Sequence, residues 1–256
     1  MAPPNRILVV SDLHLEREPG PTLDRFFAFL EGPAADASAL HILGDLFEYW
    51  IGDDACFPAA EALAATLKTL PYPVVFQHGN RDFLLGHDYA TRAGMELAPE
   101  TVRVDLGKGP AALLMHGDSL CTTDTDYQRF RTMVRGPAWQ REFLARPLWE
   151  RIAEAKRMRA HSRDAGKLKA NDITDVHPDA VTETLRRHGT SLLIHGHTHR
   201  PAIHHLLVDG RPCVRCVLPS WEEVPGYLSL NARGPRLLTL DGCDYPLGSG
   251  LPFGSA

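Results

Sequence analysis

Short aliphatic runs, each followed at once by polar residues, recur along the chain. They cover residues 7–10, 41–43, 74–77, 111–115 and 192–194. Apolar runs of this length, bounded by turn residues, are typical of strands buried in a sheet. The polar segments behind them read SDLHL, GDLFEYW, HGNRD, HGDS and HGHTH. Because open α/β sheets place their sites outside the carboxyl ends of the strands, we expect these segments to meet in one crevice.

Helical patterns fill the intervals between the predicted strands. They span residues 22–31, 58–69 and 177–188, and Pro178 is well placed for the first turn of the last helix. Alternating strands and helices predict an α/β fold in which helices cover the sheets.

The chain changes character after residue 202. Up to residue 240, strand-like runs such as CVRCVL and YLSLNA are separated by Gly and Pro turns, which predicts a second, mostly antiparallel sheet. Cys213 and Cys216 form a CxxC pair in the first run, but no second pair follows, so strand packing is favoured over a zinc site. Residues 241–256 are rich in Gly, Pro and Ser, and we expect a poorly ordered tail there.

A block without strand signals, residues 124–175, interrupts the series. Its apolar residues, among them Trp139, Phe143 and Trp149, recur near helical spacing, while Arg and Lys occupy other faces. Pro147 must break or kink the helical run. We therefore predict a helical cap at 124–175, inserted into a core made of residues 1–123 and 176–240.

Length and composition narrow the class of protein. A chain of 256 residues suits one core with an insertion and is long enough for a complete enzyme. No apolar run approaches the roughly 18 residues that span a bilayer. The start, MAPPNRILVVSD, lacks the layout of a secretory signal, and five scattered cysteines do not resemble a disulfide framework. These features predict a cytosolic protein.

The net charge of −5 hides an asymmetry. Residues 129–169 contain twelve Lys and Arg against four Asp and Glu, a balance of +8, so the remainder carries −13. A basic segment in an acidic protein favours an anionic surface or substrate, and the alternative is a solvated face without a partner.

Seven residues in the polar segments are candidate metal ligands. Carboxylate and amide oxygens together with imidazole nitrogens form a mixed set that suits manganese, iron or zinc. The set is Asp12, His14, Asp45, Asn80, His116, His197 and His199. Two ions about 4 Å apart would clamp a phosphoryl group and lower the pKa of a water molecule, so the set predicts phosphoester hydrolysis.

Each motif alone has a simpler interpretation. A DxH is commonly a turn or a surface pair, and GD and GN are ordinary turn signals. HGHTH carries more weight, because Gly196 and the compact Thr198 allow a tight loop with three imidazoles. The order of the motifs and their shared position behind strands favour the metal centre.

Together, DLH, GD, GNRD, HGD and GHTH resemble the calcineurin-like metallophosphoesterases. The longer segments ILGDLFEYWIGDD, HGNRDFLLG and MHGDSLCTTDTDYQ are similar to those of the UDP-2,3-diacylglucosamine hydrolases of lipid A biosynthesis, and the likeness runs over residues 7–240. The resemblance implies an α/β fold, a four-layer αββα metallophosphoesterase sandwich with an inserted helical cap. It also implies hydrolysis of the diphosphate of UDP-2,3-diacylglucosamine by water attack on the α-phosphate, giving UMP and 2,3-diacylglucosamine 1-phosphate (lipid X).

The resemblance also distributes the metal ligands over two divalent ions, with Mn²⁺ as the expected metal. One ion is expected at Asp12, His14, Asp45 and His199, and the other at Asp45, Asn80, His116 and His197. His195 stands outside this set, and we expect it either to have a structural role or to support the ligands from behind.

The expected catalytic residues are Asp45, Asn80, Arg81 and His116. The expected substrate contacts are Asn80, Arg81, Asp124, Tyr127, Ser162, Gly166, Lys169 and His197. The family pattern has an asparagine where this chain has Gly166, which puts one polar contact in doubt, and Arg163 or Lys167 are the alternatives.

Arg81 stands where many metallophosphoesterases have a histidine. An arginine cannot act as a general acid near neutral pH, but its guanidinium can fork onto phosphate oxygens. UMP and a sugar phosphate are leaving groups that need little protonation, so Arg81 fits a diphosphate substrate. The alternative is a salt bridge from Arg81 to Asp82 or to another carboxylate.

The implied partners are a lipid-linked UDP-sugar and, through the basic cap, an anionic membrane surface, at about 1 kcal/mol per basic residue near that surface. For the apolar cap residues, contact with acyl chains and packing onto the sheet stay open. We expect a monomer at the cytoplasmic face of the inner membrane, with no nucleic-acid partner. Two other functions stay open: a soluble metallophosphoesterase acting on nucleotides or other phosphodiesters, and a scaffold without metal chemistry.

Overall fold

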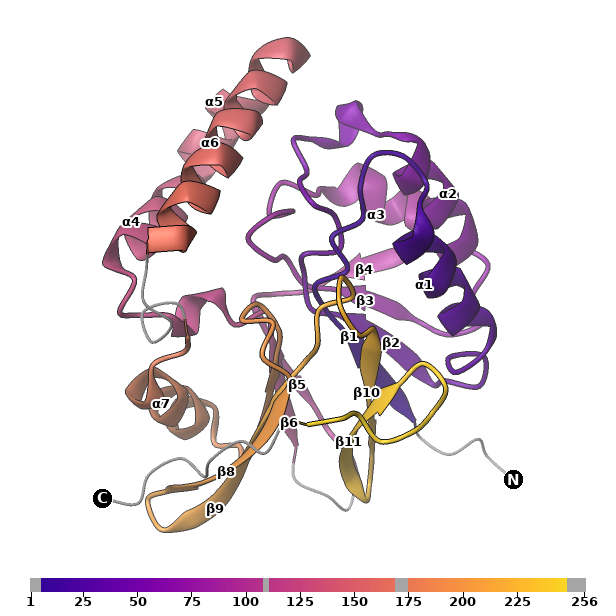
Figure 1. Ribbon diagram of the computed structural model, residues 1–256, viewed down its shortest axis with the longest axis vertical. Coiled ribbons are helices and arrows are strands. Elements are labelled where there is room, and N and C mark those ends of the chain that lie inside the picture. The colour runs from indigo at the N-terminus through magenta and orange to yellow at the C-terminus, as the bar shows by residue number, and fades with distance from the viewer. Residues whose placement is uncertain (1–5, 108–110, 169–174, 248–256) are drawn as a thin grey trace.

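Two β-sheets lie at the centre of the protein, in a computed structural model that describes residues 6–107, 111–168 and 175–247, with side chains up to residue 159 of the cap's longest helix (Figure 1). The first sheet has the order β11-β10-β1-β2-β3-β4. Its strands are β1 (Ile7–Val10), β2 (Ala39–Ile42), β3 (Val74–Phe76), β4 (Met95–Leu97), β10 (Gly226–Asn231) and β11 (Gly234–Thr239).

The second sheet has the order β5-β6-β7-β9-β8. Its strands are β5 (Thr101–Val104), β6 (Ala112–Met115), β7 (Leu192–His195), β8 (Ala202–Val208) and β9 (Arg211–Val217). On the outer face of the first sheet lie α1 (Pro21–Glu31), α2 (Pro58–Leu67) and α3 (His87–Ala93), and on that of the second lies α7 (Pro178–His188).

The alternation of side chains along each strand builds four layers. Leu8 of β1 packs in the cluster beneath α1 and α2, whereas its neighbour Val9 packs between the two sheets. In β6, Leu114 faces the inter-sheet space and Leu113 faces α7. Since successive residues of a strand point to opposite faces, a fully apolar strand can be buried on both sides. The expected αββα sandwich is confirmed.

The five strands and three helices predicted from the pattern are present, with ends that differ by at most a few residues. The predicted second, mostly antiparallel sheet of residues 202–240 is wrong. β8 and β9 extend the sheet of β6 and β7, while β10 and β11 pair beside β1 in the other sheet. The pattern of a strand tells which residues are buried, but it does not tell which strand will be its partner. Cys213 and Cys216 of β9 pack in different core clusters, on opposite faces of their sheet.

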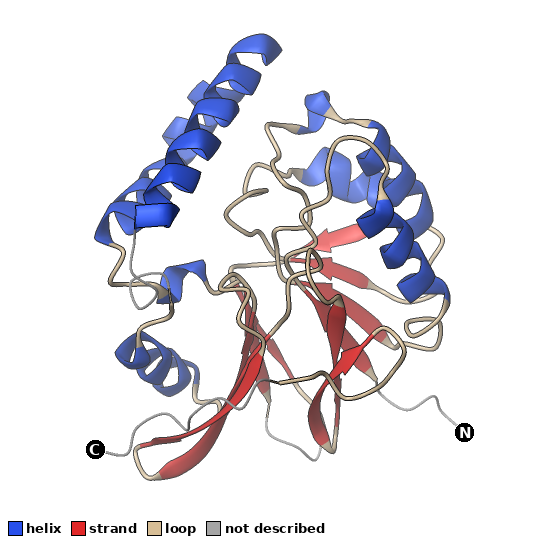
Figure 2. Cartoon of the chain, in the orientation of Figure 1, coloured by secondary structure: helices blue, strands red, loops and turns tan. Residues whose placement is uncertain are grey.

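Three helices stand apart from the sandwich, on one side of it (Figure 2). They are α4 (Thr125–Val134), α5 (Pro137–Leu144) and α6 (Leu148–Leu168), and they fall within the predicted insertion. Pro147 lies between α5 and α6, as expected of a residue that breaks a helix. Trp139 and Phe143 stack on each other at 4.8 Å and pack against the first core cluster, so these two aromatics fasten the cap to the core.

The described part of the predicted tail, residues 241–247, folds back onto the first sheet. Tyr245 donates its backbone N–H to Leu237 of β11 and its hydroxyl to the carbonyl of Val224, both at 2.9 Å. Residues 248–256 lie outside the described part of the chain. Among the helices that the structure describes, none combines the length and the apolar character needed to cross a bilayer.

Candidate metal centre

The candidate ligands lie in the loops that follow five strands, three from one sheet and two from the other. Asp12 and His14 follow β1, Asp45 follows β2 and Asn80 follows β3. His116 follows β6, and His197 and His199 follow β7. The site therefore straddles the carboxyl ends of both sheets, which is why the polar segments meet although their strands belong to separate sheets.

Five of these residues have a left-handed backbone. Their φ angles are between 50° and 68°, and the residues are Asp12, His14, Asp45, His197 and His199. Non-glycine residues seldom adopt positive φ, and such conformations gather at functional sites. Among described non-glycine residues, only Asp209 shares this conformation. The geometry of the loops thus singles out the same positions as the chemistry of their side chains.

The glycines before the ligands are required by close packing. A Cβ on Gly44, whose φ is +81°, would lie 2.2 Å from the backbone nitrogen of Gly79. A Cβ on Gly196 would lie 2.1 Å from Ser11 Oγ and 2.2 Å from Asp12 Oδ2. Larger residues would push the loops apart, so the glycines of GD and GH bring the ligand loops into contact.

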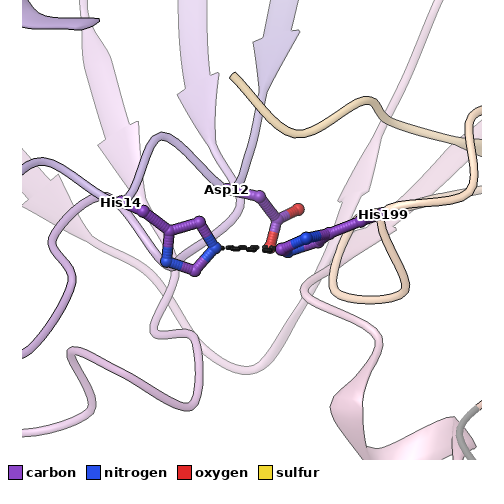
Figure 3. Close-up of side chains that lie close together, drawn as sticks. All are labelled: Asp12, His14 and His199. Carbon is purple, nitrogen blue, oxygen red and sulfur yellow. Dashed lines mark hydrogen bonds and ion pairs between the residues drawn. The ribbon is translucent and has the colours of Figure 1, made fainter. Parts of the chain in front are cut away.

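A first group of ligand atoms surrounds Asp12. The rings of His14 and His199 point toward each other beside its carboxylate, with 3.2 Å between their Nε2 atoms (Figure 3). His199 Nε2 lies 3.3 Å from Asp12 Oδ1, and His14 Nε2 lies 4.0 Å from the same oxygen. Asp12, His14 and His199 can therefore offer one atom each to a shared cation.

A second group lies around Asn80. Its side-chain oxygen is 3.0 Å from His116 Nε2 and 2.8 Å from His197 Nδ1. His116 uses its other ring nitrogen to contact the carbonyl of Leu43 at 2.7 Å, which orients the ring.

Asp45 lies between the two groups. Its Oδ2 is 4.0 Å from His14 Nε2, while its Oδ1 is 3.7 Å from His116 Nε2 and accepts the backbone N–H of Arg81 at 2.8 Å. A carboxylate with one oxygen toward each group fits the predicted bridging role.

The donor set fits divalent cations. Asp12 Oδ2 accepts hydrogen bonds from Ser11 Oγ at 2.6 Å and from the backbone N–H of His197 at 2.9 Å. Asp12 Oδ1 is fully buried and has no hydrogen-bond donor among the described residues. An orphaned carboxylate oxygen facing imidazole nitrogens is costly unless a cation or proton compensates it.

Protonation also favours metal binding. Burial alone would raise the pKa of Asp12, but the close contact with His199 and the charges of His116 and His14 hold it well below its usual value. Burial lowers the pKa of His197 to about 4, and a charge on His116 acts in the same direction. Asp12 is thus anionic and His197 neutral near pH 7, which are the forms that bind metals.

Asp82 clamps two ligand loops together. Its Oδ2 accepts the N–H of Leu46 at 2.8 Å, and its Oδ1 accepts the N–H of Gly79 at 2.9 Å. The alternative considered for Arg81 was a salt bridge to Asp82, but the ion pairs of the described residues do not include it. Arg81 Nε is buried and has no hydrogen-bond partner among those residues. Arg81 itself is held through its backbone, because its carbonyl accepts the backbone N–H of Trp50 at 3.0 Å.

Asp118, which sequence reasoning did not single out, ties the cap to the metal centre. Its buried carboxylate accepts the hydroxyl of Tyr127 at 2.7 Å and Arg131 Nε at 2.8 Å, and lies 3.3 Å from a guanidinium nitrogen of Arg135. Burial raises its pKa, but His116, Arg135 and Arg131 more than offset this, so the pKa lies well below its usual value. The only signal in the sequence was its position two residues after His116.

The structure locates some of the predicted substrate contacts near the metal centre, while others lie outside the side chains that it describes. Tyr127 stacks on the ring of His197 at 6.1 Å, beside the second ligand group. Asp124 caps α4, where its Oδ1 accepts the N–H of Tyr127 at 3.1 Å. Ser162 and Gly166 fall in α6 beyond the last described side chain, and Lys169 lies outside the described residues.

The basic excess of the cap serves largely to hold ion pairs. Seven arginines in residues 129–159 lie within 4.0 Å of a carboxylate, namely Arg129, Arg131, Arg135, Arg146, Arg151, Arg157 and Arg159. Four of them reach acids of the core, among them Arg151, which binds Asp54, and Arg159, which binds Glu48. The described basic residues are thus cap anchors more than a free cationic face.

Comparisons with known proteins agree with this geometry. The model of the calcineurin-like phosphoesterase family matches residues 5–201. A UDP-2,3-diacylglucosamine hydrolase of Stenotrophomonas maltophilia is 49% identical over 243 residues, which covers 91% of this chain and 98% of the relative. One of Aromatoleum aromaticum is 49% identical over 232 residues, covering 89% and 94%. Among solved structures, a phosphoesterase from E. coli is similar at 17% identity, a TM-score of 0.46 and 93% and 96% coverage.

Proposed function

We propose a function from the premise that the chain belongs to the calcineurin-like phosphoesterases and, within them, to the UDP-2,3-diacylglucosamine hydrolases. The protein hydrolyses the diphosphate bond of UDP-2,3-diacylglucosamine and releases UMP and 2,3-diacylglucosamine 1-phosphate, a step of lipid A biosynthesis. It is a metal-dependent hydrolase, and the soluble nucleotide phosphoesterase is the less favoured alternative.

The observation that carries this proposal is the buried ligand set, in which Asp12 Oδ1 has no donor among described residues while two imidazoles face it. Two divalent ions held by these residues, for which we propose Mn²⁺, would supply positive charge to polarise the α-phosphate and to lower the pKa of a water molecule. One ion is assigned to Asp12, His14, Asp45 and His199, and the other to Asp45, Asn80, His116 and His197.

Substrate binding and orientation depend on side chains of the protein itself. Asn80 and Arg81 lie side by side after β3, so the guanidinium of Arg81 can fork onto phosphate oxygens next to the second ligand group. Arg81 stays protonated and donates no proton to the leaving group. UMP and a sugar phosphate are stable anions, so the reaction proceeds without a general acid at this position. Tyr127, stacked on His197, keeps that ring in place.

Substrate contacts in the cap belong to the same proposal. They are Asp124, Tyr127, Ser162, Gly166 and Lys169, together with Asn80, Arg81 and His197. We also propose that the protein acts as a monomer at the cytoplasmic face of the inner membrane. Support comes from the corner between α5 and α6, where Leu144, Leu148 and Trp149 are 39%, 40% and 69% exposed. Exposed apolar side chains of this size suit insertion among lipid headgroups.

The direct test is UMP release from UDP-2,3-diacylglucosamine with and without Mn²⁺, in the native protein and in Asp45→Ala. We expect Mn²⁺-dependent release by the native protein and a loss of at least about 100-fold in the variant, since both ligand groups lose their shared carboxylate. Rapid hydrolysis of bis-p-nitrophenyl phosphate without UMP release would instead support the soluble alternative. No release with bound metal would overturn the assigned substrate.

A further inference from the structure

Glu48, a residue outside the ligand set, lies between the cap and the metal centre. It follows β2 in the segment GDLFE, three residues after Asp45. Its Oε2 is 3.0 Å from His14 Nδ1, a charge contact that lacks the alignment of a hydrogen bond, and its Oε1 binds the guanidinium of Arg159 on α6. The Glu48 side chain is only 14% exposed and that of His14 only 4%, so water competes weakly for these contacts.

We propose that Glu48 is a positioning residue that couples the docking of cap helix α6 to the affinity of the metal centre. A carboxylate next to Nδ1 holds the ring proton on that nitrogen and leaves the lone pair of Nε2 free. Nε2 is the atom of His14 that faces Asp12, Asp45 and His199. The charge of Glu48 therefore favours the tautomer of His14 that leaves Nε2 free to bind a cation. The inference rests on the metal centre of the proposed function.

Arg159 extends the contact to the cap. Its guanidinium binds Glu48 and lies over the ring of Tyr49, at 5.6 Å from the centroid. When α6 is docked, Arg159 holds the carboxylate of Glu48 against His14. When α6 is displaced, Glu48 loses this partner and can turn away from the ring. Coupling of this kind is reciprocal, so a metal that selects the aligned His14 also favours the docked cap.

A second anchor on the same helix provides a control. Arg151 of α6 binds the carboxylate of Asp54 and donates to the carbonyl of Ile51 at 2.6 Å. Asp54 is 64% exposed, and its hydrogen bonds and ion pairs within the described part of the chain are with Arg151, not with a candidate metal ligand. Asp54→Asn therefore removes an exposed contact of α6 but leaves Arg159 paired with Glu48, whereas Glu48→Gln and Arg159→Ala break the connection to His14.

The test is a calorimetric titration of the metal-free protein with Mn²⁺. It is carried out on the native chain and on the three variants. Removing a carboxylate behind a metal-bound histidine costs about 10- to 100-fold in affinity, and we expect this loss in Glu48→Gln for the ion assigned to His14. Arg159→Ala should weaken binding at least about 5-fold. Asp54→Asn should stay within about twofold of the native protein.

Hydrogen exchange in α6 supplies a readout that a merely structural role would not change. Mn²⁺ should slow exchange in α6 of the native protein and of Asp54→Asn, but not in Glu48→Gln. Native affinity in both Glu48→Gln and Arg159→Ala would overturn the coupling, as would an equal loss in Asp54→Asn. A chain that binds Mn²⁺ as expected but releases no UMP leaves the coupling intact and overturns only the substrate. Failure of the native chain to bind Mn²⁺ overturns both.

Discussion

At the scale of single residues, the metal centre is built by chain geometry as much as by side-chain chemistry. Five candidate ligands have positive φ, which costs on the order of 1–3 kcal/mol for a residue other than glycine. Hydrogen bonds between loops hold this geometry, such as the N–H of Asp12 to the carbonyl of Gly44 at 3.1 Å. The ligands are therefore presented in advance, and a bound cation stabilises the folded state further.

Asp12→Asn tests this arrangement. An asparagine keeps the size of the side chain but removes the negative charge that faces His14 and His199. A ligand present at 100 times its Kd stabilises a protein by about 2.7 kcal/mol, so Mn²⁺ should raise the unfolding free energy of the native protein and raise that of the variant far less. Denaturant unfolding with and without Mn²⁺ measures the difference, and an equal rise in both proteins would contradict the assignment of Asp12.

Arg81→Lys distinguishes the contribution of the forked guanidinium from that of its positive charge. Lysine keeps one positive charge but lacks the fork that binds two phosphate oxygens, so we expect kcat/KM for UMP release to fall about tenfold or more. The side chain of Arg81 anchors nothing among the described residues, so thermal unfolding should not change. If the melting temperature and kcat/KM both fall in Arg81→Lys, Arg81 has a structural role instead.

At the scale of elements, the cap is fastened by polar contacts at both ends and by aromatics between them. α4 reaches Asp118, and α6 reaches Asp54 and Glu48, while Trp139 packs on the core from α5. Three of the four helix-to-core contacts involve arginines of the basic segment. The charge excess that suggested an anionic partner is thus partly explained by docking within the protein.

The Asp118 anchor predicts a pH dependence. The folded-state pKa of Asp118 lies below its usual value of about 4, so its contribution to stability is present above pH 4 and is lost as the pH falls through the folded-state pKa. Asp118→Asn should destabilise the metal-free protein by about 1–3 kcal/mol near pH 7, because the half-buried Arg131 and Arg135 lose the charge of a buried partner, and by less toward pH 3. Urea unfolding between pH 3 and 7 measures both effects.

The exposed Asp126→Asn, which removes the partner of Arg129 at the surface of α4, is the matched control. Its effect should stay below about 1 kcal/mol at every pH, as for other surface pairs. A loss in Asp118→Asn that does not shrink at low pH would argue that the residue acts through packing and not through charge.

At the scale of the whole molecule, the two sheets create the site between them. β1, β2 and β3 bring their loops from one sheet, and β6 and β7 bring theirs from the other. The cap then stands beside this edge, and its α5–α6 corner carries exposed Trp149. An exposed apolar corner on the cap is the feature on which the proposed membrane docking depends.

Trp149→Glu tests the membrane docking. Burying a large apolar side chain contributes about 1.5–3 kcal/mol, so binding to vesicles of anionic phospholipid should fall roughly tenfold or more. Leu207→Glu is the control, because Leu207 is 72% exposed but lies on β8, away from the cap. UMP release from detergent-dispersed substrate should be unchanged in both variants. Equal vesicle binding by both variants and the native protein would contradict docking through this corner.

The sequence by itself determined the strands, the cap and the ligand types, because alternation, helical spacing and residue chemistry are local properties. Asp12, His14 and Asp45 were recognisable from their motifs. The division of the last four strands between two sheets was not, since pairing depends on partners remote along the chain. Nor were the roles of Asp118 and Glu48, whose neighbours Arg131 and Arg159 are brought to them only when the cap folds against the core. Distances between such side chains are decided by packing, and only the tertiary structure contains them.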